Sequence, residues 1–86
     1  MPKLPRVSSI DTVKTLEKLG FVQVRQKGSH LILKKKLSLL ESKITGKIEL
    51  GCIVPMQRKT LAVGTLKNIL NQANISVEDF LNNLNN

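Results

Sequence analysis

The chain has 86 residues, of which 14 are Lys or Arg and 6 are Asp or Glu, so its formal net charge is +8. This length suits one domain over residues 1–86 and leaves no room for a second. One cysteine and one histidine exclude an internal disulfide and the usual zinc site, so we expect no metal and no cofactor, and a buried, inert Cys52. No apolar run approaches the ~20 residues that span a membrane, and the start lacks an apolar signal core, so we expect a cytoplasmic protein with no membrane contact.

The first predicted element is a helix over residues 8–20. Ser8 and Asp11 have the spacing of a capping box. Apolar residues recur at roughly helical period and form one stripe, Ile10, Val13, Leu16 and Leu19. Gly20 is suited to end this helix in a left-handed conformation.

Two strands joined by a tight turn are predicted next, at residues 21–27 and 30–35. Alternation in the first strand places Val22 and Val24 on one face and puts three polar residues on the other, Gln23, Arg25 and Lys27. Gly28-Ser29 is a turn signal. Alternation in the second strand gives one face to His30, Ile32 and Lys34, and the other to Leu31, Leu33 and Lys35.

The rest of the chain predicts one more strand and two helices. Residues 36–47 are polar and contain Gly46, so we expect a long hairpin loop, or strand ends with a flexible tip. A third strand over residues 47–55 ends at Pro55, a connecting loop follows, and helices are expected at residues 64–74 and 75–84. The order α-β-β-β-α(α) predicts an α+β fold with a three-stranded antiparallel sheet and helices on one face.

Basic residues are concentrated in the first part of the chain. Residues 1–63 contain 13 of the 14 basic residues but only four of the six acidic ones. A small domain with such an asymmetric charge typically meets a polyanion or an acidic protein. The alternative is a solvated basic surface with no specific partner.

Three motifs, together with this order of elements, resemble the HicA family of toxins. They are "LEKLGFVQVRQKGSHLIL", with Gly-Ser-His after a strand; "CIVPMQRKTLAVGTLKNIL", with Val-Pro, a polar loop and Gly-Thr-Leu; and "NQANISVEDFLNNL". Two departures from the family pattern stand out. Met56-Gln57 occupies the place where members often carry a second histidine, and the stretch from Lys36 to Lys47 is longer than usual.

The resemblance implies a fold like that of double-stranded RNA-binding domains and an activity that cleaves mRNA, as the toxin of a type II toxin–antitoxin system. It also implies that the histidine of Gly-Ser-His, His30, is the catalytic residue. The expected partners are RNA and a HicB-like antitoxin that covers the active site. The oligomeric state, the RNA targets and the cleavage preference stay open.

The chemistry of the residues is compatible with a metal-independent endoribonuclease. RNA carries its own nucleophile, the 2′-hydroxyl, and imidazole exchanges protons near neutral pH. His30 is therefore the candidate general base, or the acid for the leaving oxygen, and water or a lysine takes the second part. Phosphate contacts are expected from residues around the turn and after Pro55, namely Arg25, Lys27, Gly28, Ser29, Lys34, Lys35, Arg58 and Lys59. Of these, Lys34 shares the face of His30.

Two other functions fit the same composition. A non-catalytic double-stranded RNA-binding module would share the fold and the charge without needing His30. A plain interaction protein would use its basic face only for an acidic partner. The chain has no Trp or Tyr, so the aromatic platforms of common single-strand RNA binders are missing.

Overall fold

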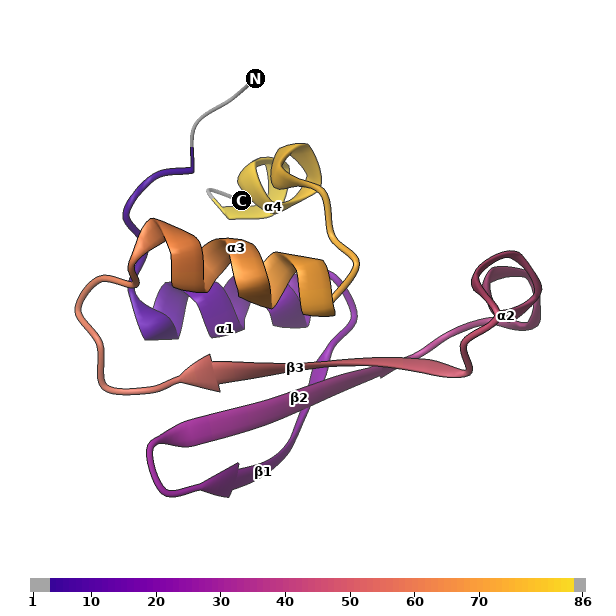
Figure 1. The fold of residues 1–86 in the computed structure, drawn as a ribbon, viewed down its shortest axis with the longest axis horizontal. Coiled ribbons are helices and arrows are strands. Elements are labelled where there is room, and N and C mark those ends of the chain that lie inside the picture. The colour runs from indigo at the N-terminus through magenta and orange to yellow at the C-terminus, as the bar shows by residue number, and fades with distance from the viewer. Residues whose placement is uncertain (1–3, 85–86) are drawn as a thin grey trace.

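The computed structural model describes residues 4–84, which form three strands and four helices (Figure 1). In chain order these are α1 (Ser9–Lys18), β1 (Val22–Lys27), β2 (His30–Lys36), α2 (Leu39–Thr45), β3 (Glu49–Pro55), α3 (Val63–Gln72) and α4 (Val77–Leu84). The predicted α+β class is confirmed, with one added helix, α2, between the second and third strands. The likeness to double-stranded RNA-binding domains stays a prediction.

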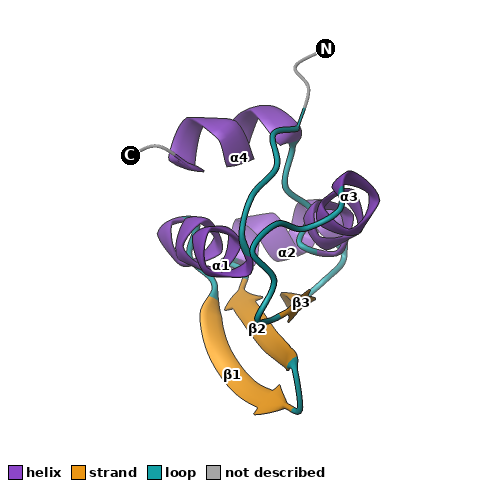
Figure 2. Cartoon of the chain, turned by 90° about the vertical axis from the view of Figure 1, so that its left-hand side faces the viewer, coloured by secondary structure: helices purple, strands orange, loops and turns teal. Residues whose placement is uncertain are grey.

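The three strands form one antiparallel sheet in the order β1-β2-β3, as predicted. β2 and β3 pair from His30 opposite Pro55 to Lys36 opposite Glu49, without a break in register. Alternate residues of these two strands are buried on one face, Leu31, Leu33, Leu50, Cys52 and Val54. Figure 2 shows α1, α3 and α4 on one side of the sheet, with β1 the strand farthest from them. The opposite face is called the outer face below.

The helix layer and the inner face of the sheet enclose the core. α1 and α3 both pack on β3, and α4 packs on α1. Phe80 of α4 and Leu66 of α3 have no exposed surface, and Leu70 is 2% exposed. The described residues of β1, by contrast, are all exposed, because the helices do not extend over that strand. This edge strand is therefore held by its pairing with β2 alone.

α1 begins at a capped N-terminus and is followed by a glycine. Ser8 Oγ accepts a hydrogen bond from the backbone N–H of Asp11 at 3.0 Å. Gly20 has φ +101°, which residues with a side chain rarely adopt, so the chain can turn away there. Leu16 of the predicted apolar stripe is fully buried, but Ile10 is 60% exposed. The prediction is wrong at Ile10 because this side of the first turn faces a hollow instead of the core.

The segment between β2 and β3 is a helix, so the predicted loop is wrong. Ser38 and Glu41 form a reciprocal capping box, and Gly46 closes the helix in the left-handed conformation at φ +74°. These signals are present in the sequence, but Gly46 and the polar residues also fit a loop. α2 buries none of its side chains, and Leu39, at 85%, and Ile44, at 76%, are mostly exposed. Figure 1 shows α2 projecting beyond the rest of the domain.

Candidate functional site

His30 is the first residue of β2 and follows a two-residue turn made by Gly28 and Ser29. Gly28 has φ +61° and Ser29 has a negative φ, which is the pattern of a type II′ hairpin turn. The side-chain amide of Gln26 donates to the Gly28 carbonyl at 3.1 Å. No atom lies within 4 Å of the position that a Cβ on Gly28 would take, so the turn is open to an approaching phosphate. His30 itself is exposed.

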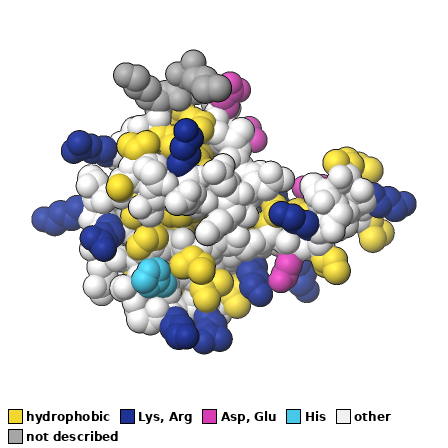
Figure 3. All heavy atoms as spheres, viewed as in Figure 1, with side chains coloured by type: hydrophobic (Ala, Val, Ile, Leu, Met, Phe, Trp, Pro, Cys, Tyr) yellow, Lys and Arg dark blue, Asp and Glu magenta, His cyan; other side chains and the backbone are white. Residues whose placement is uncertain are grey.

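Two residues flank His30 across the sheet. Lys27 of β1 is its register partner on one side and Pro55 of β3 on the other. Directly paired residues have Cα atoms about 5 Å apart and share a face. Lys27 and His30 therefore stand side by side on the outer face. Figure 3 shows the histidine on an open surface, with basic side chains and an apolar strip close to it.

A β-bulge in β1 changes which residues at the start of that strand share this face. The register shifts between Gln23 and Arg25, so that Val24 is an extra residue in the ladder. Arg25 then lies opposite Ile32, and Lys27 lies opposite His30. The prediction that Val22 faces away from Arg25 and Lys27 is wrong, because the bulge interrupts the alternation of side chains. As a result Val22 joins Arg25 and Lys27 on the outer face, and Gln23 lies on the helix side.

The two lysines predicted farther along β2 lie on opposite faces. Lys34 is on the outer face with His30, and its Nζ forms an ion pair with Glu49 Oε1 at 3.3 Å. Four residues of strand separate it from His30 by about 13 Å, so the two cannot contact the same phosphate. Lys35 lies on the helix side, where its chain passes close to Gly20. Lys35 is therefore separated from the His30 surface.

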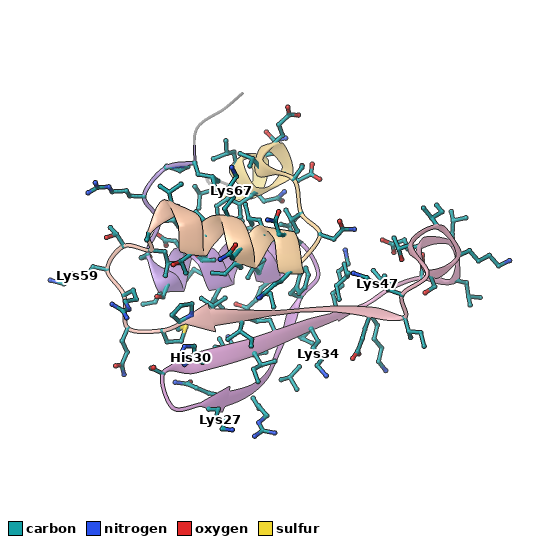
Figure 4. The ribbon with its side chains drawn as sticks, in the orientation of Figure 1. Lys27, His30, Lys34, Lys47, Lys59 and Lys67 are labelled. Atoms are coloured by element: carbon teal, nitrogen blue, oxygen red, sulfur yellow. The ribbon has the colours of Figure 1, made fainter. Side chains whose placement is uncertain are left out.

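Arg58 and Lys59 lie in the loop after β3, at the same end of the sheet as His30. Ser9, which has no exposed surface, holds this loop against α1. Its Oγ donates to the Pro55 carbonyl at 2.6 Å and accepts from the Arg58 N–H at 3.2 Å, and its own N–H donates to the Arg58 carbonyl at 3.1 Å. Figure 4 shows Lys27, His30 and Lys59 toward one end of the sheet, with Lys34 farther along and Lys47 near α2.

The site therefore gathers most, but not all, of the predicted residues. Its members at the sheet tip, a name we use for residues 27–30 and 55–59, are Lys27, Gly28, Ser29, His30, Arg58 and Lys59. Arg25 adjoins them on the outer face, Lys34 is more distant, and Lys35 is on the other face. Sequence reasoning missed Ser9, whose buried hydroxyl bonds across 46 residues.

Gln57 is a second feature that sequence reasoning did not resolve. It has φ +65°, a left-handed conformation that costs a residue with a side chain of order 1 kcal/mol or more. The bonds of Ser9 to Pro55 and to Arg58, on either side of Gln57, hold the loop in this shape. Such tertiary restraint leaves no local signature in the sequence.

Cys52 plays no part in this site. It is 2% exposed, as predicted, and burial raises the pKa of its thiol to about 11. The thiol is therefore protonated at neutral pH and is a poor nucleophile. Within residues 4–84, no group of three or more His, Cys, Asp or Glu side chains could hold a metal ion. None of the helices formed by these residues is long and apolar enough to cross a membrane.

Residues 11–75 match a family model described as HicA toxin of bacterial toxin-antitoxin. This span includes β1, β2, β3 and α3, and with them the whole sheet tip. No curated protein matches the chain significantly.

Proposed function

The chain belongs to the HicA toxin family, as its motifs predict, and on this premise we propose that it is an endoribonuclease that cleaves mRNA without a metal ion. The observation that carries the proposal is the pair of outer-face side chains His30 and Lys27 beside an open glycine turn. This pair offers one group that exchanges protons and one cation, on a surface that a phosphodiester can reach.

The reaction that we propose uses the RNA's own 2′-hydroxyl. The O2′–P bond forms while the P–O5′ bond breaks, the proton leaves O2′, and another proton is added to O5′. His30 serves one of these two oxygens, and water or a lysine serves the other. Lys27, directly across the strand pair, stabilises the negative charge that develops on the phosphoryl oxygens. The products are a 2′,3′-cyclic phosphate and a free 5′-hydroxyl.

We propose that an antitoxin of the HicB type covers this same face, since the family belongs to toxin–antitoxin systems. The outer face carries apolar side chains that are largely exposed, Val22 at 62%, Val24 at 50% and Ile53 at 46%. A contiguous apolar strip flanked by cations is typical of a surface that a partner protein buries. An antitoxin seated on this strip would block access to His30.

The test compares purified wild type with His30→Ala on a single RNA. The wild type should cleave it, and His30→Ala should lose about 10²- to 10⁴-fold in rate, because a positioned acid or base contributes that much. An RNA with a 2′-deoxy sugar at the cleaved position should resist the wild type. Because His30 is exposed, the variant should keep the wild-type melting temperature, which serves as the control for folding.

Two results would count against this proposal. A folded His30→Ala variant that cleaves at the wild-type rate would remove His30 from the mechanism. If neither protein cleaves and both bind duplex RNA equally well, the chain is a non-catalytic RNA-binding module.

A further inference from the structure

A hollow of about 580 Å³ lies beside the sheet tip, between the N-terminal end of α1 and the inner side of β1. Its volume falls within the ~300–1,000 Å³ of typical small-ligand sites. Apart from Ser8 and Ser9 at the start of α1, its lining consists of Ile10, Gln26, Met56, Gln57, Arg58 and Lys59. This α1–β1 hollow is separate from the outer face, where His30 stands.

The fold creates the α1–β1 hollow by leaving β1 uncovered. The register that follows the bulge puts Gln26 opposite Leu31, on the helix side of the sheet. No helix reaches over β1, so this side of the strand is open. On the opposite wall, Ser9 holds the loop through Arg58, and Gln57 takes its left-handed conformation there.

The lining combines apolar side chains, amide groups and two cations. Ile10, which is 60% exposed, and Met56 supply the apolar surface. Gln26 and Gln57 supply amides, and the side chain of Gln57 makes no hydrogen bond within residues 4–84. Arg58 is one of two cations in the lining, which contains no Asp or Glu.

A phosphate is a poor candidate for the centre of the α1–β1 hollow. Two donors at the N-terminal end of α1 are already used: the Asp11 N–H donates to Ser8 Oγ, and the Ser9 N–H donates to the Arg58 carbonyl. What remains is an apolar surface with amide groups, and two cations that both come from the loop after β3. This arrangement suits a flat heterocycle whose edge forms hydrogen bonds and which is attached to a negatively charged chain.

We propose that the α1–β1 hollow binds an unpaired nucleobase of the RNA substrate, next to the phosphate that is cleaved. Ile10 and Met56 contact the faces of the base, and the amides of Gln26 and Gln57 bond its edge, since proteins hold an unstacked base between apolar side chains and read its edge. Arg58 and Lys59 contact the adjoining phosphates. The inference rests on the proposed ribonuclease function and specifies its substrate as single-stranded, because a paired base could not enter.

The loop after β3 lines the hollow and is also bonded to the turn before His30, which supports the joint use of both sites by one RNA strand. The Met56 N–H donates to the Ser29 carbonyl at 2.6 Å, and the preceding Pro55 pairs with His30. An RNA strand that passes around the open turn at Gly28 would present a base to one side of the sheet tip and a phosphate to the other.

The test measures RNA affinity on the His30→Ala background, so that cleavage does not interfere. The first probe is a single-stranded RNA oligonucleotide that the wild type cleaves, or one of mixed sequence if the wild type cleaves none. The second is a series of the same strand with an abasic site at each position in turn. The third is the same strand paired with its complement. One abasic position should weaken binding by about 5- to 100-fold, since one bound base contributes that much. The duplex should bind more weakly than the single strand.

Two variants then connect that position with the hollow. Gln57→Gly suits the left-handed backbone, and Gln26→Ala truncates an exposed side chain and removes one exposed hydrogen bond, to the Gly28 carbonyl, so both should fold; Gln57→Gly leaves the turn before His30 intact and is the decisive variant. Each variant should weaken binding of the intact strand. Each should also reduce the abasic penalty, which is the loss of affinity caused by removing the base at that position. Gln23→Ala is the matched control, because Gln23 is an exposed glutamine of the same strand outside the hollow. It should bind as the parent protein does.

The outcomes separate this inference from the proposed function. A position-dependent abasic penalty that Gln57→Gly removes would support the base site, even in a protein that fails to cleave RNA. Cleavage that depends on His30 but shows no abasic penalty would overturn the base site alone. RNA affinity equal to that of the parent protein in both hollow variants would also overturn it.

Discussion

The two ends of the β2–β3 ladder are built in different ways. At the sheet tip, Ser9 of α1 bonds to Pro55 and Arg58, and Met56 bonds to Ser29, so residues far apart in the chain hold one another. At the opposite end, the arm formed by residues 37–48 carries α2, whose helical residues are all at least partly exposed. The hydrogen bonds of α2 connect residues only two to four apart.

This difference indicates which end can hold a reacting group in place. A proton-transferring side chain needs a fixed position relative to its substrate, and tertiary hydrogen bonds supply it. A segment with few buried contacts opens locally at little cost in free energy. We therefore expect β2 and the loop after β3 to open only with the whole domain and the arm to open independently. The following predictions test this contrast.

The largest contrast is expected from the same substitution at the two leucines Leu33 and Leu40. Leu33 has no exposed surface, so Leu33→Ala should lower the free energy of unfolding by about 2–5 kcal/mol. Leu40 is 69% exposed, so Leu40→Ala should change it by less than about 0.5 kcal/mol. Urea denaturation followed by circular dichroism measures both. A decrease in the free energy of unfolding for Leu40→Ala equal to that for Leu33→Ala would mean that the arm packs on the domain in solution.

A smaller effect is expected at the sheet tip from Ser9→Ala. The change leaves the Pro55 carbonyl and the Arg58 N–H without their partner, which should lower the free energy of unfolding by about 1–3 kcal/mol. RNA cleavage should fall as well, because the loop that carries Arg58 loses its anchor. The free energy of unfolding is measured by urea denaturation and the cleavage rate by an RNA assay, on one preparation of the protein. Ser42→Ala, in the exposed α2, serves as the control and should leave cleavage unchanged. Full activity in Ser9→Ala would show that the anchor does not position the site.

The smallest effect is expected in the arm and depends on pH. The hydrogen bond from the backbone of Ser38 lowers the pKa of Glu41. The pKa of Glu41 is lower in the folded protein than in the unfolded chain. The hydrogen bond therefore stabilises α2 at pH values above the unfolded-state pKa, and this stabilisation is lost as the pH falls through the folded-state pKa. Amide exchange in α2, corrected for intrinsic rates, should therefore speed up below about pH 4, while β2 stays protected.

Ser38→Ala should reproduce this loss at neutral pH, with exchange in α2 faster by about 2- to 30-fold. The control is Ser76→Ala, which removes the equivalent capping hydroxyl of α4, where it accepts from the Asp79 N–H at 3.1 Å. That variant should leave exchange in α2 unchanged. If acid or Ser38→Ala speeds exchange in β2 as much as in α2, the arm and the sheet open together.

Much of the fold could be predicted from the sequence because the signals are local. Ser8 with Asp11 marked the start of α1, Gly28-Ser29 marked the hairpin, and Pro55 marked the end of β3. Alternation along β2 correctly assigned the buried leucines. The arm was mispredicted although its capping box is visible in the sequence, since α2 lacks the buried apolar stripe that usually identifies a helix.

The candidate site was predictable only in part. The motif identified His30 and the turn before it, and alternation correctly grouped Arg25 with Lys27. It failed beyond the bulge at Val24, which puts Val22 on their face and Gln23 on the helix side. No pattern in the residues announces that bulge, because it depends on pairing with β2. The role of Ser9 likewise depends on a partner 46 residues away.

The sequence by itself determined the class of fold, the order of the strands and the family, because caps, turns and periodicity act over a few residues and the motifs can be compared directly. Only the tertiary structure decided which basic side chains stand beside His30, which part of α1 anchors the loop after Pro55, and where an open hollow adjoins it. The physical reason is that these features depend on strand register and on hydrogen bonds between distant segments, which exist only once the chain has folded.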